Sequence, residues 1–135
     1  MRFILLIFCL FAVTACDENT PTGPSVPLNQ QFTLAPGEAV RIEATPYAVR
    51  FVRVSNDSRC PGDAICITGG DALVHIQIFD GTSPTEYELH TGDERRGTVT
   101  HATLRVGLVQ VQPYPFASLP PIKPGDYRVT LQTVG

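Results

Sequence analysis

The sequence contains no tryptophan and a single lysine, Lys123, and charged residues make up only 17% of its 135 residues. Lysine and arginine together number 10 against 13 acidic residues, which gives a formal net charge of −3. Proteins that bind DNA or RNA through the phosphate backbone need a cluster of basic side chains. The composition therefore excludes broad nucleic-acid binding.

The sequence also lacks any long segment with the 3.6-residue apolar repeat of an amphipathic helix. Its 135 residues are enough for one compact domain and leave no room for a second catalytic lobe or a complete dinucleotide-binding unit. No serine stands in a Gly-x-Ser-x-Gly setting, and no nucleophile has an evident base and acid beside it. We therefore expect a non-catalytic protein that needs no cofactor.

The N-terminal segment 1–15 has the layout of a secretory signal peptide. Arg2 supplies a positive charge, the stretch from Phe3 to Val13 is uninterrupted and apolar, and small residues follow. A transmembrane helix needs about 20 apolar residues, so this stretch is too short to span a bilayer. The segment predicts export.

The segment Val13-Thr14-Ala15-Cys16 resembles the signal of bacterial lipoproteins. The resemblance implies that the Cys16 thiol is alkylated by diacylglycerol and becomes the acylated N-terminus, which would anchor the exported protein to a bacterial membrane. An ordinary cleaved signal, with Cys16 incidental, is the alternative. Asp17 resembles an inner-membrane retention signal of some bacteria, and the choice between inner and outer membrane stays open.

Residues 16–30 are expected to form a lipidated, proline-rich tether, because they include Pro21, Gly23, Pro24 and Pro27 and show no apolar periodicity. Residues 31–135 instead alternate apolar and polar side chains, as in Ala72, Val74, Ile76 and Ile78, which is typical of half-buried strands. We predict an all-β domain, an antiparallel sandwich of about seven strands with immunoglobulin-like or related topology. The expected strands are 31–35, 38–44, 47–55, 71–79, 84–90, 99–111 and 126–134.

Two of these strands break the alternation. Apolar residues change faces between Phe51 and Val52, and again after Gly107. A β-bulge at each place would return the later residues to the core, whereas a strand covered on both faces is the alternative.

Two cysteines remain once Cys9 is removed with the signal and Cys16 is lipidated. Cys60 and Cys66 in an exported protein are expected to form one disulfide. A redox-active pair would need Cys-x-x-Cys spacing, and a structural zinc site would need more thiolates, so both are disfavoured.

A motif around these cysteines resembles a group of uncharacterised bacterial secreted and lipid-anchored β proteins. It consists of Asp-Ser-Arg-Cys-Pro at 57–61, the second cysteine Cys66, Gly-Asp-Ala at 70–72, and the closing segment 124–131. A tryptophan often follows the second cysteine in that group, whereas Ile67 stands here. The resemblance implies a fold and an exported location and brings no known activity.

Three acidic residues, Asp57, Asp63 and Asp71, flank the expected disulfide loop. Carboxylates are calcium ligands, but their spacing matches no EF-hand. The alternative is that Asp57 and Asp63 bond backbone amides in tight turns, and that Asp57 and Arg59 pair with each other or with the backbone. We favour this structural role.

The histidines are candidates for metal binding. A hairpin between 84–90 and 99–106 would place His90 opposite His101, with no evident third ligand, so a solvated pair is the favoured interpretation. His75 is expected on the outer face of its strand. The apolar, proline-rich segment 112–122 is expected to cover one end of the sandwich, with an exposed binding ledge as the alternative.

These observations lead to three functional hypotheses. The favoured one is a lipid-anchored, non-catalytic binding or envelope-associated module with a protein partner of unknown identity. The second is an inhibitor of exported proteases that acts through the Cys60–Cys66 loop. The third is a metal-binding protein or hydrolase that uses the aspartates or histidines.

Overall fold

The computed structural model describes residues 20–135, so the expected signal peptide and Cys16 lie outside the described residues. Within these residues the chain forms nine strands and two short 3₁₀ turns. The strands are β1 (Ser25–Val26), β2 (Gln31–Leu34), β3 (Ala39–Ile42), β4 (Ala48–Ser55), β5 (Leu73–Phe79), β6 (Thr85–His90), β7 (Thr98–His101), β8 (Leu104–Gln112) and β9 (Arg128–Val134); the turns are η1 (Glu94–Arg96) and η2 (Pro124–Asp126).

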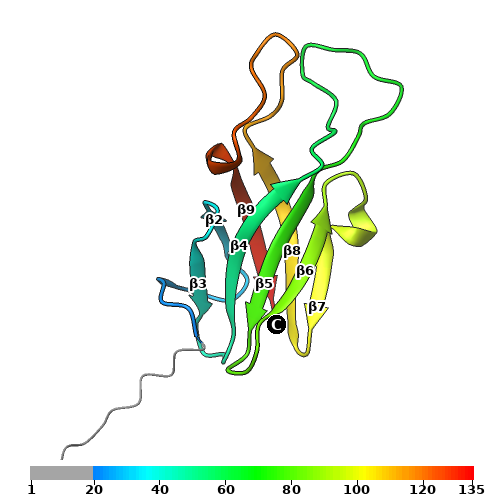
Figure 1. Cartoon of the computed structure of the whole chain (residues 1–135). Helices are drawn as coiled ribbons and strands as arrows, with labels where there is room; N and C mark the ends of the chain where they lie inside the picture. Colours follow the sequence, from blue (N-terminus) through cyan, green and yellow to red (C-terminus); the bar gives the residue numbers. More distant parts are fainter. Residues whose placement is uncertain (1–19) are drawn as a thin grey trace, which may run out of the picture.

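The strands form two sheets that pack face to face (Figure 1). One sheet has the order β1-β3-β4-β5-β6 and the other the order β2-β9-β8-β7. All neighbours are antiparallel except β1 and β3. The expected all-β sandwich is confirmed, with nine strands instead of seven. Consecutive strands are neighbours in most places, so the order is that of a meander and differs from the order of immunoglobulin domains.

The core lies between the sheets and consists of the residues that alternate along each strand. Phe51, Ile76 and Leu131 have no exposed surface. Burial of each such side chain contributes roughly 1.5–3 kcal/mol relative to exposure. Because strand side chains repeat with period two, the alternation in the sequence identifies this core directly.

Both expected bulges are present. The pairing of β4 with β5 shifts register between Phe51 and Arg53, and that of β8 with β9 shifts between Leu108 and Gln110. The second bulge lies just after Gly107, where the sequence pattern placed it. Its effect is to return Val111 to the core, where only 5% of its surface is exposed.

The expected hairpin between 84–90 and 99–106 is wrong. β6 pairs with β5, which places His90 opposite Leu73, whereas β7 pairs with β8 in the other sheet. The expected strand 99–111 is broken at Ala102, whose φ of 51° turns the chain back on itself. A tight local turn closes a smaller loop than the predicted pairing, so its entropic cost is lower.

The sandwich begins earlier in the chain than expected. Ser25 and Val26, within the segment predicted as tether, pair with β3, and the backbone N–H of Arg41 donates to the carbonyl of Pro24 at 2.9 Å. Val26 and Leu28 also pack against the core. In residues 20–135 no helix is long and apolar enough to cross a membrane.

Two long connections meet at one end of the sandwich, opposite the end that carries the C-terminus (Figure 1). The first connection joins β4 to β5 and contains Cys60 and Cys66, and the second joins β8 to β9. We call them the disulfide loop (residues 56–72) and the proline loop (residues 113–127).

Candidate functional site: the paired loops

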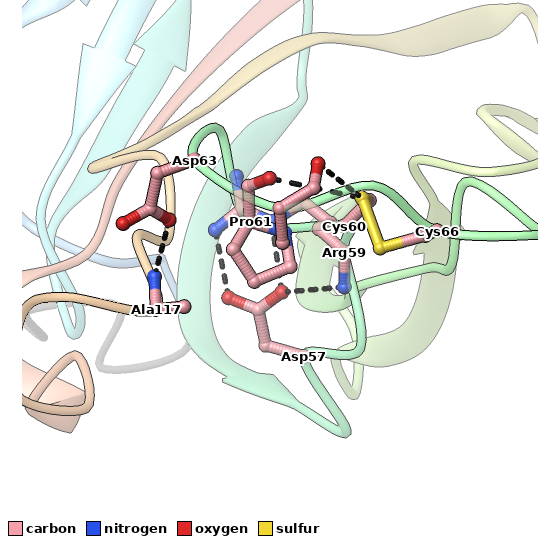
Figure 2. Close-up of a disulfide and its surroundings, with 8 residues drawn as sticks. Asp57, Arg59, Cys60, Pro61, Asp63, Cys66 and Ala117 are labelled. Carbon is pink, nitrogen blue, oxygen red and sulfur yellow. Dashed lines mark hydrogen bonds and ion pairs between the residues drawn. A yellow bond between two sulfur atoms is a disulfide. The ribbon is translucent and has the colours of Figure 1, made fainter.

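The disulfide loop is closed by the expected bond between Cys60 and Cys66, whose Cα atoms are 5.9 Å apart (Figure 2). Its two arms are also joined by backbone hydrogen bonds, from Ser58 N–H to the Asp71 carbonyl at 2.6 Å and from Cys60 N–H to the Gly69 carbonyl at 2.9 Å. Gly70 has a φ of +68°, and a Cβ there would overlap the Ser58 carbonyl, so the close approach of the arms requires glycine.

A buried ion pair stands at the base of this loop. The Arg59 guanidinium donates to both carboxylate oxygens of Asp57, from Nε at 2.8 Å and from Nη2 at 2.7 Å, and only 8% of Arg59 is exposed. The Tyr127 hydroxyl also donates to Asp57, at 2.9 Å. The predicted pairing of Asp57 with Arg59 is confirmed. The bidentate geometry fixes the plane of the guanidinium as well as its position.

The electrostatics of this pair follow from burial and hydrogen bonding. Burial alone would raise the pKa of Asp57, but the hydrogen bonds from Arg59 and Tyr127 outweigh it and lower the pKa. Burial and the hydrogen bond to Asp57 together raise the pKa of Tyr127 to about 12. At neutral pH the carboxylate is therefore ionised and the phenol is neutral.

Arg59 also binds the neighbouring loop. Its Nη1 donates to the carbonyl of Val111 at 2.8 Å, its Nη2 donates to that of Pro113 at 3.0 Å, and its guanidinium carbon lies 5.3 Å from the centre of the Tyr114 ring. The last contact has cation–π geometry. One arginine thus joins the disulfide loop to the end of β8 and the start of the proline loop.

Asp63 makes a second connection between the loops. Its carboxylate accepts the backbone N–H of Ala117 at 2.6 Å (Figure 2). It also accepts the backbone N–H of Ser118 at 2.9 Å. Hydrogen bonds from the Ser118 side chain and the Ala117 backbone lower the pKa of Asp63. Nearby, the Phe116 ring packs against Gly62, whose N–H donates to the Pro115 carbonyl at 2.9 Å. The carboxylate of Asp63 therefore holds two chain segments in place.

Apolar side chains at the surface of these loops face solvent. Ile65 and Ile67, on either side of Cys66, are fully exposed at 104% and 105% of their reference surface, and three side chains of the proline loop are exposed as well. The segment 112–122 was expected to cover one end of the sandwich. Ile122 of this segment packs against the core, whereas Phe116 and Leu119 are exposed. We call the exposed set the apolar tip: Ile65, Ile67, Tyr114, Phe116 and Leu119.

Asp71 lies with His90, away from the other two aspartates. Its Oδ2 is 2.6 Å from His90 Nδ1, its Oδ1 accepts the Gly92 N–H at 2.8 Å, and Glu88 lies 3.1 Å from His90 Nε2. Burial would raise the pKa of Asp71, but the hydrogen bonds from Gly92 and His90 lower it. The three aspartates predicted as candidate calcium ligands thus have three separate sets of partners. In residues 20–135 no group of three or more His, Cys, Asp or Glu side chains is placed to hold a metal ion.

His75 takes part in a serine–histidine–carboxylate arrangement on the outer face of the five-stranded sheet. Ser55 Oγ lies 2.7 Å from Nε2 of His75, and Glu86 lies 3.3 Å from Nδ1. The order of groups is that of a catalytic triad. The paired backbone N–H groups of these strands, however, lie in the plane of the sheet and bond to neighbouring strands, so they do not point at a group placed over Ser55.

His101 is bound between two different side chains. Its Nδ1 lies 2.9 Å from the Tyr87 hydroxyl, and its Nε2 lies 3.0 Å from Asp80. Hydrogen bonds from Thr82 and His101 lower the pKa of Asp80 to about 2. Sequence reasoning missed the pairs of His90 with Asp71 and of His101 with Asp80 because the partners come from distant segments of the chain and have no fixed spacing.

Comparisons with protein-family models, with curated proteins and with solved structures found no match for this chain. The fold and the paired loops therefore define the protein only as an all-β sandwich with a disulfide-closed loop at one end. Its function has to be argued from the geometry of that end.

Proposed function

We propose that this protein is an exported, lipid-anchored β module that binds a protein partner through the apolar tip and carries out no catalysis. The observation that carries the proposal is the full exposure of Ile65 and Ile67 next to Cys66. Exposed apolar side chains favour association, because binding removes them from water, and aromatic residues such as Tyr114 are enriched at the centres of interfaces.

The loops that carry the apolar tip are held in place before a partner arrives. The disulfide, the Arg59–Asp57 pair and the Asp63 contacts fix the two loops to each other. A surface that is already ordered loses less conformational entropy on binding than a mobile one. This rigidity supports recognition through shape and apolar contact.

Photocrosslinking in cells tests the tip. A photoreactive phenylalanine analogue replaces Ile65 in the full-length chain, and the control carries the same analogue at Val134, which is 38% exposed at the opposite end of β9. We expect a discrete crosslinked adduct from position 65 that Ile67→Ser reduces at least fivefold, and none from position 134. Equal adducts from both positions would reject the tip as the binding surface.

The anchor is tested separately. Cys16→Ser, or an inhibitor of the lipoprotein signal peptidase, should leave an unprocessed precursor with a larger mass on electrophoresis. The motivation is the segment Val13-Thr14-Ala15-Cys16. Normal processing of the Cys16→Ser chain would contradict lipidation while leaving the proposed binding surface untouched.

Inhibition of exported proteases is a second candidate function. The observation that favours it is that a short covalent ring presents exposed side chains in a fixed conformation, which resists the rearrangement needed for cleavage. The test is an assay of the full-length chain in detergent against serine, cysteine and metalloproteases, before and after reduction of the disulfide. Inhibition that disappears on reduction is the expected result, and no inhibition of any class would remove this function.

A further inference from the structure

A groove of about 450 Å³ lies between β8 and the connection from β6 to β7. Thr91 and Glu94 of this connection line one side, and residues 108–112 of β8 line the other. Arg59 and Tyr114, which come from the two loops, complete the lining. The volume lies in the range of natural binding pockets, roughly 300–1,000 Å³. We call this site the β8 groove.

Neutral side chains that form hydrogen bonds line the groove from both β8 and β7. Gln110 and Gln112 are exposed, and because they are two residues apart their amides lie on the same face of β8. Thr98 of β7 is also exposed and lines the groove. Each amide and each hydroxyl can both donate and accept a hydrogen bond. The lining therefore matches a ligand that presents donors and acceptors together at several points.

The charges of the lining are almost entirely compensated. The Arg59 guanidinium is bound to both carboxylate oxygens of Asp57, and His90 lies 2.6 Å from Asp71. Within residues 20–135, Glu94 is the one other charged side chain that lines the groove. An anionic ligand would therefore meet no uncompensated cation, and a polycation would meet a single carboxylate. The lining favours an uncharged ligand.

The lining also offers a buried donor and two apolar contacts. Arg59 is only 8% exposed, and four of the N–H groups of its guanidinium bind Asp57 and two backbone carbonyls. A guanidinium has five, so one N–H on Nη1 has no partner in residues 20–135 and can donate to a ligand. Tyr114 and Val109 are 50% and 46% exposed and give apolar surface beside these polar groups.

Two other classes of ligand fit the groove poorly. An extended peptide would find no strand edge, because Gln110 and Gln112 pair with β9 and Arg59 already binds the outward carbonyl of Val111. A purely apolar ligand would bury the two glutamine amides without hydrogen-bond partners, which costs free energy. A neutral ligand with many hydroxyl groups avoids both difficulties.

We propose that the β8 groove binds a carbohydrate, in the form of the neutral sugar rings of an oligosaccharide or polysaccharide. The hydroxyls around a sugar ring each donate and accept, as the side chains of Gln110, Gln112 and Thr98 do. The C–H groups on the face of the ring form an apolar surface that can pack against Tyr114. The site goes beyond the proposed function, because neither Ile65 nor Ile67 lines it.

The test is a titration followed by NMR on the full-length chain in dodecylphosphocholine micelles, a detergent without a sugar headgroup. The probes are the neutral tetrasaccharides cellotetraose, maltotetraose, mannotetraose and chitotetraose. Tetragalacturonate, which has the same length and one carboxylate on each ring, is the control ligand. We expect at least one neutral probe to shift the side-chain amide signals of Gln110 and Gln112 until they saturate, and tetragalacturonate to leave them in place.

Two pairs of variants supply matched controls. Gln110→Ala removes an amide from the groove and should weaken binding of the neutral probe about fivefold, whereas Gln31→Ala, in exposed β2 at the opposite edge of the same sheet, should leave it unchanged. Thr98→Trp fills the groove and should abolish binding, whereas Thr100→Trp lies outside the lining and should not. Far-UV circular dichroism checks that all four variants are folded.

Several outcomes would overturn the proposal. They are the absence of a shift with every neutral probe, equal weakening by Gln110→Ala and Gln31→Ala, or tighter binding of tetragalacturonate than of the neutral probes. Shifts of the same amides that appear on concentrating the chain without sugar, and that Thr98→Trp abolishes, would assign the groove to a second copy instead. Ile67→Ser should leave sugar binding unchanged, so a failure of the proposed tip and a failure of this site are distinguishable.

Discussion

The middle of the sandwich and its loop end place polar and apolar groups in opposite ways. Between the sheets, Phe51 and Ile76 are buried and the charged side chains of the strands face outward. At the loop end, Arg59 is buried while Ile65 and Ile67 are fully exposed. The two regions are therefore held by different forces, burial of apolar side chains between the sheets and a few directed bonds at the loop end.

The two kinds of force have different consequences for function. Burial of apolar area is non-directional, and a protein interior tolerates many combinations of side chains that fill the same volume. A bidentate ion pair has one geometry, and removal of either partner leaves the other charge without compensation. The loop end is therefore specified by Asp57 and Arg59, and its apolar side chains stay in contact with solvent.

The largest expected effect on stability comes from removing one partner of the ion pair between Asp57 and Arg59. Arg59→Met keeps the length of the side chain and leaves Asp57 buried without a counter-charge, so we expect a loss of about 3 kcal/mol in the free energy of unfolding. Urea denaturation followed by circular dichroism measures it. Arg59→Met combined with Asp57→Asn should recover at least a third of the loss. A single substitution that costs less than about 1 kcal/mol would contradict the view that this pair holds the loop end.

Removal of the disulfide should have the next largest effect. Cys60→Ser combined with Cys66→Ser opens a short ring, which the chain-entropy model values at about 2 kcal/mol. The loop is also held by Arg59 and Asp63, so we expect the sandwich to stay folded and the loss to appear as a lower urea midpoint. Complete unfolding of this variant at 25 °C would show that the disulfide, and not the ion pair, organises the loop end.

The Tyr127 hydroxyl gives a smaller, pH-dependent effect. Tyr127→Phe removes a hydrogen bond to a charged group, and we expect a loss of about 1.5 kcal/mol at neutral pH. Because folding raises the pKa of Tyr127 to about 12 from 10.0, its contribution is complete below pH 10 and is lost as the pH rises through about 12. The wild type should therefore approach the stability of Tyr127→Phe over this interval.

At acid pH the stability depends on pH in the opposite direction. Folding lowers the pKa of Asp57 from 3.8, so its contribution is present above that value and is lost as the pH falls through the lower pKa of the folded state. Thermal unfolding measured from pH 2 to pH 12 should show both losses of stability, that from Asp57 at acid pH and that from Tyr127 at alkaline pH. Parallel curves for the wild type and Tyr127→Phe at alkaline pH would contradict the coupling of Tyr127 to Asp57.

The smallest effect on stability is expected at the apolar tip. Ile65→Ser combined with Ile67→Ser changes side chains that are already in water, so the free energy of unfolding should change by less than about 0.5 kcal/mol. Ile67→Ser alone, combined with the photoreactive analogue at position 65, should reduce crosslinking of a partner strongly. A large loss of stability would mean that these isoleucines pack inside the fold. The loop end would then be held by apolar burial, as the region between the sheets is.

Much of the fold was predictable because its signals are local. The alternation of Val74, Ile76 and Ile78 predicted a strand and its buried face, and the breaks near Phe51 and Gly107 predicted bulges. The disulfide followed from the two cysteines that remain after Cys9 and Cys16 are assigned to the predicted export signal. Each of these predictions depends on residues that are close in sequence or on a simple count.

The pairing of strands could not be predicted in the same way. Period-two alternation identifies the faces of a strand but is satisfied by more than one partner, and so the sequence favoured His90 opposite His101. The positive φ of Ala102 divided that segment into two strands, although alanine is not a residue that signals such a turn. The contact of Arg59 with Val111 joins residues that are far apart in the chain and have no pattern in common.

The sequence by itself determined the class of fold, the single disulfide and the pairing of Asp57 with Arg59, because each is encoded by periodicity, composition or near neighbours. Only the tertiary structure decided that the disulfide loop meets the proline loop and that Ile65 and Ile67 face solvent. It also decided that β8 extends beyond the last residue paired with β7. The physical reason is that surfaces and grooves form where distant segments meet. Their position depends on strand order and register, which the alternation of side chains leaves undetermined.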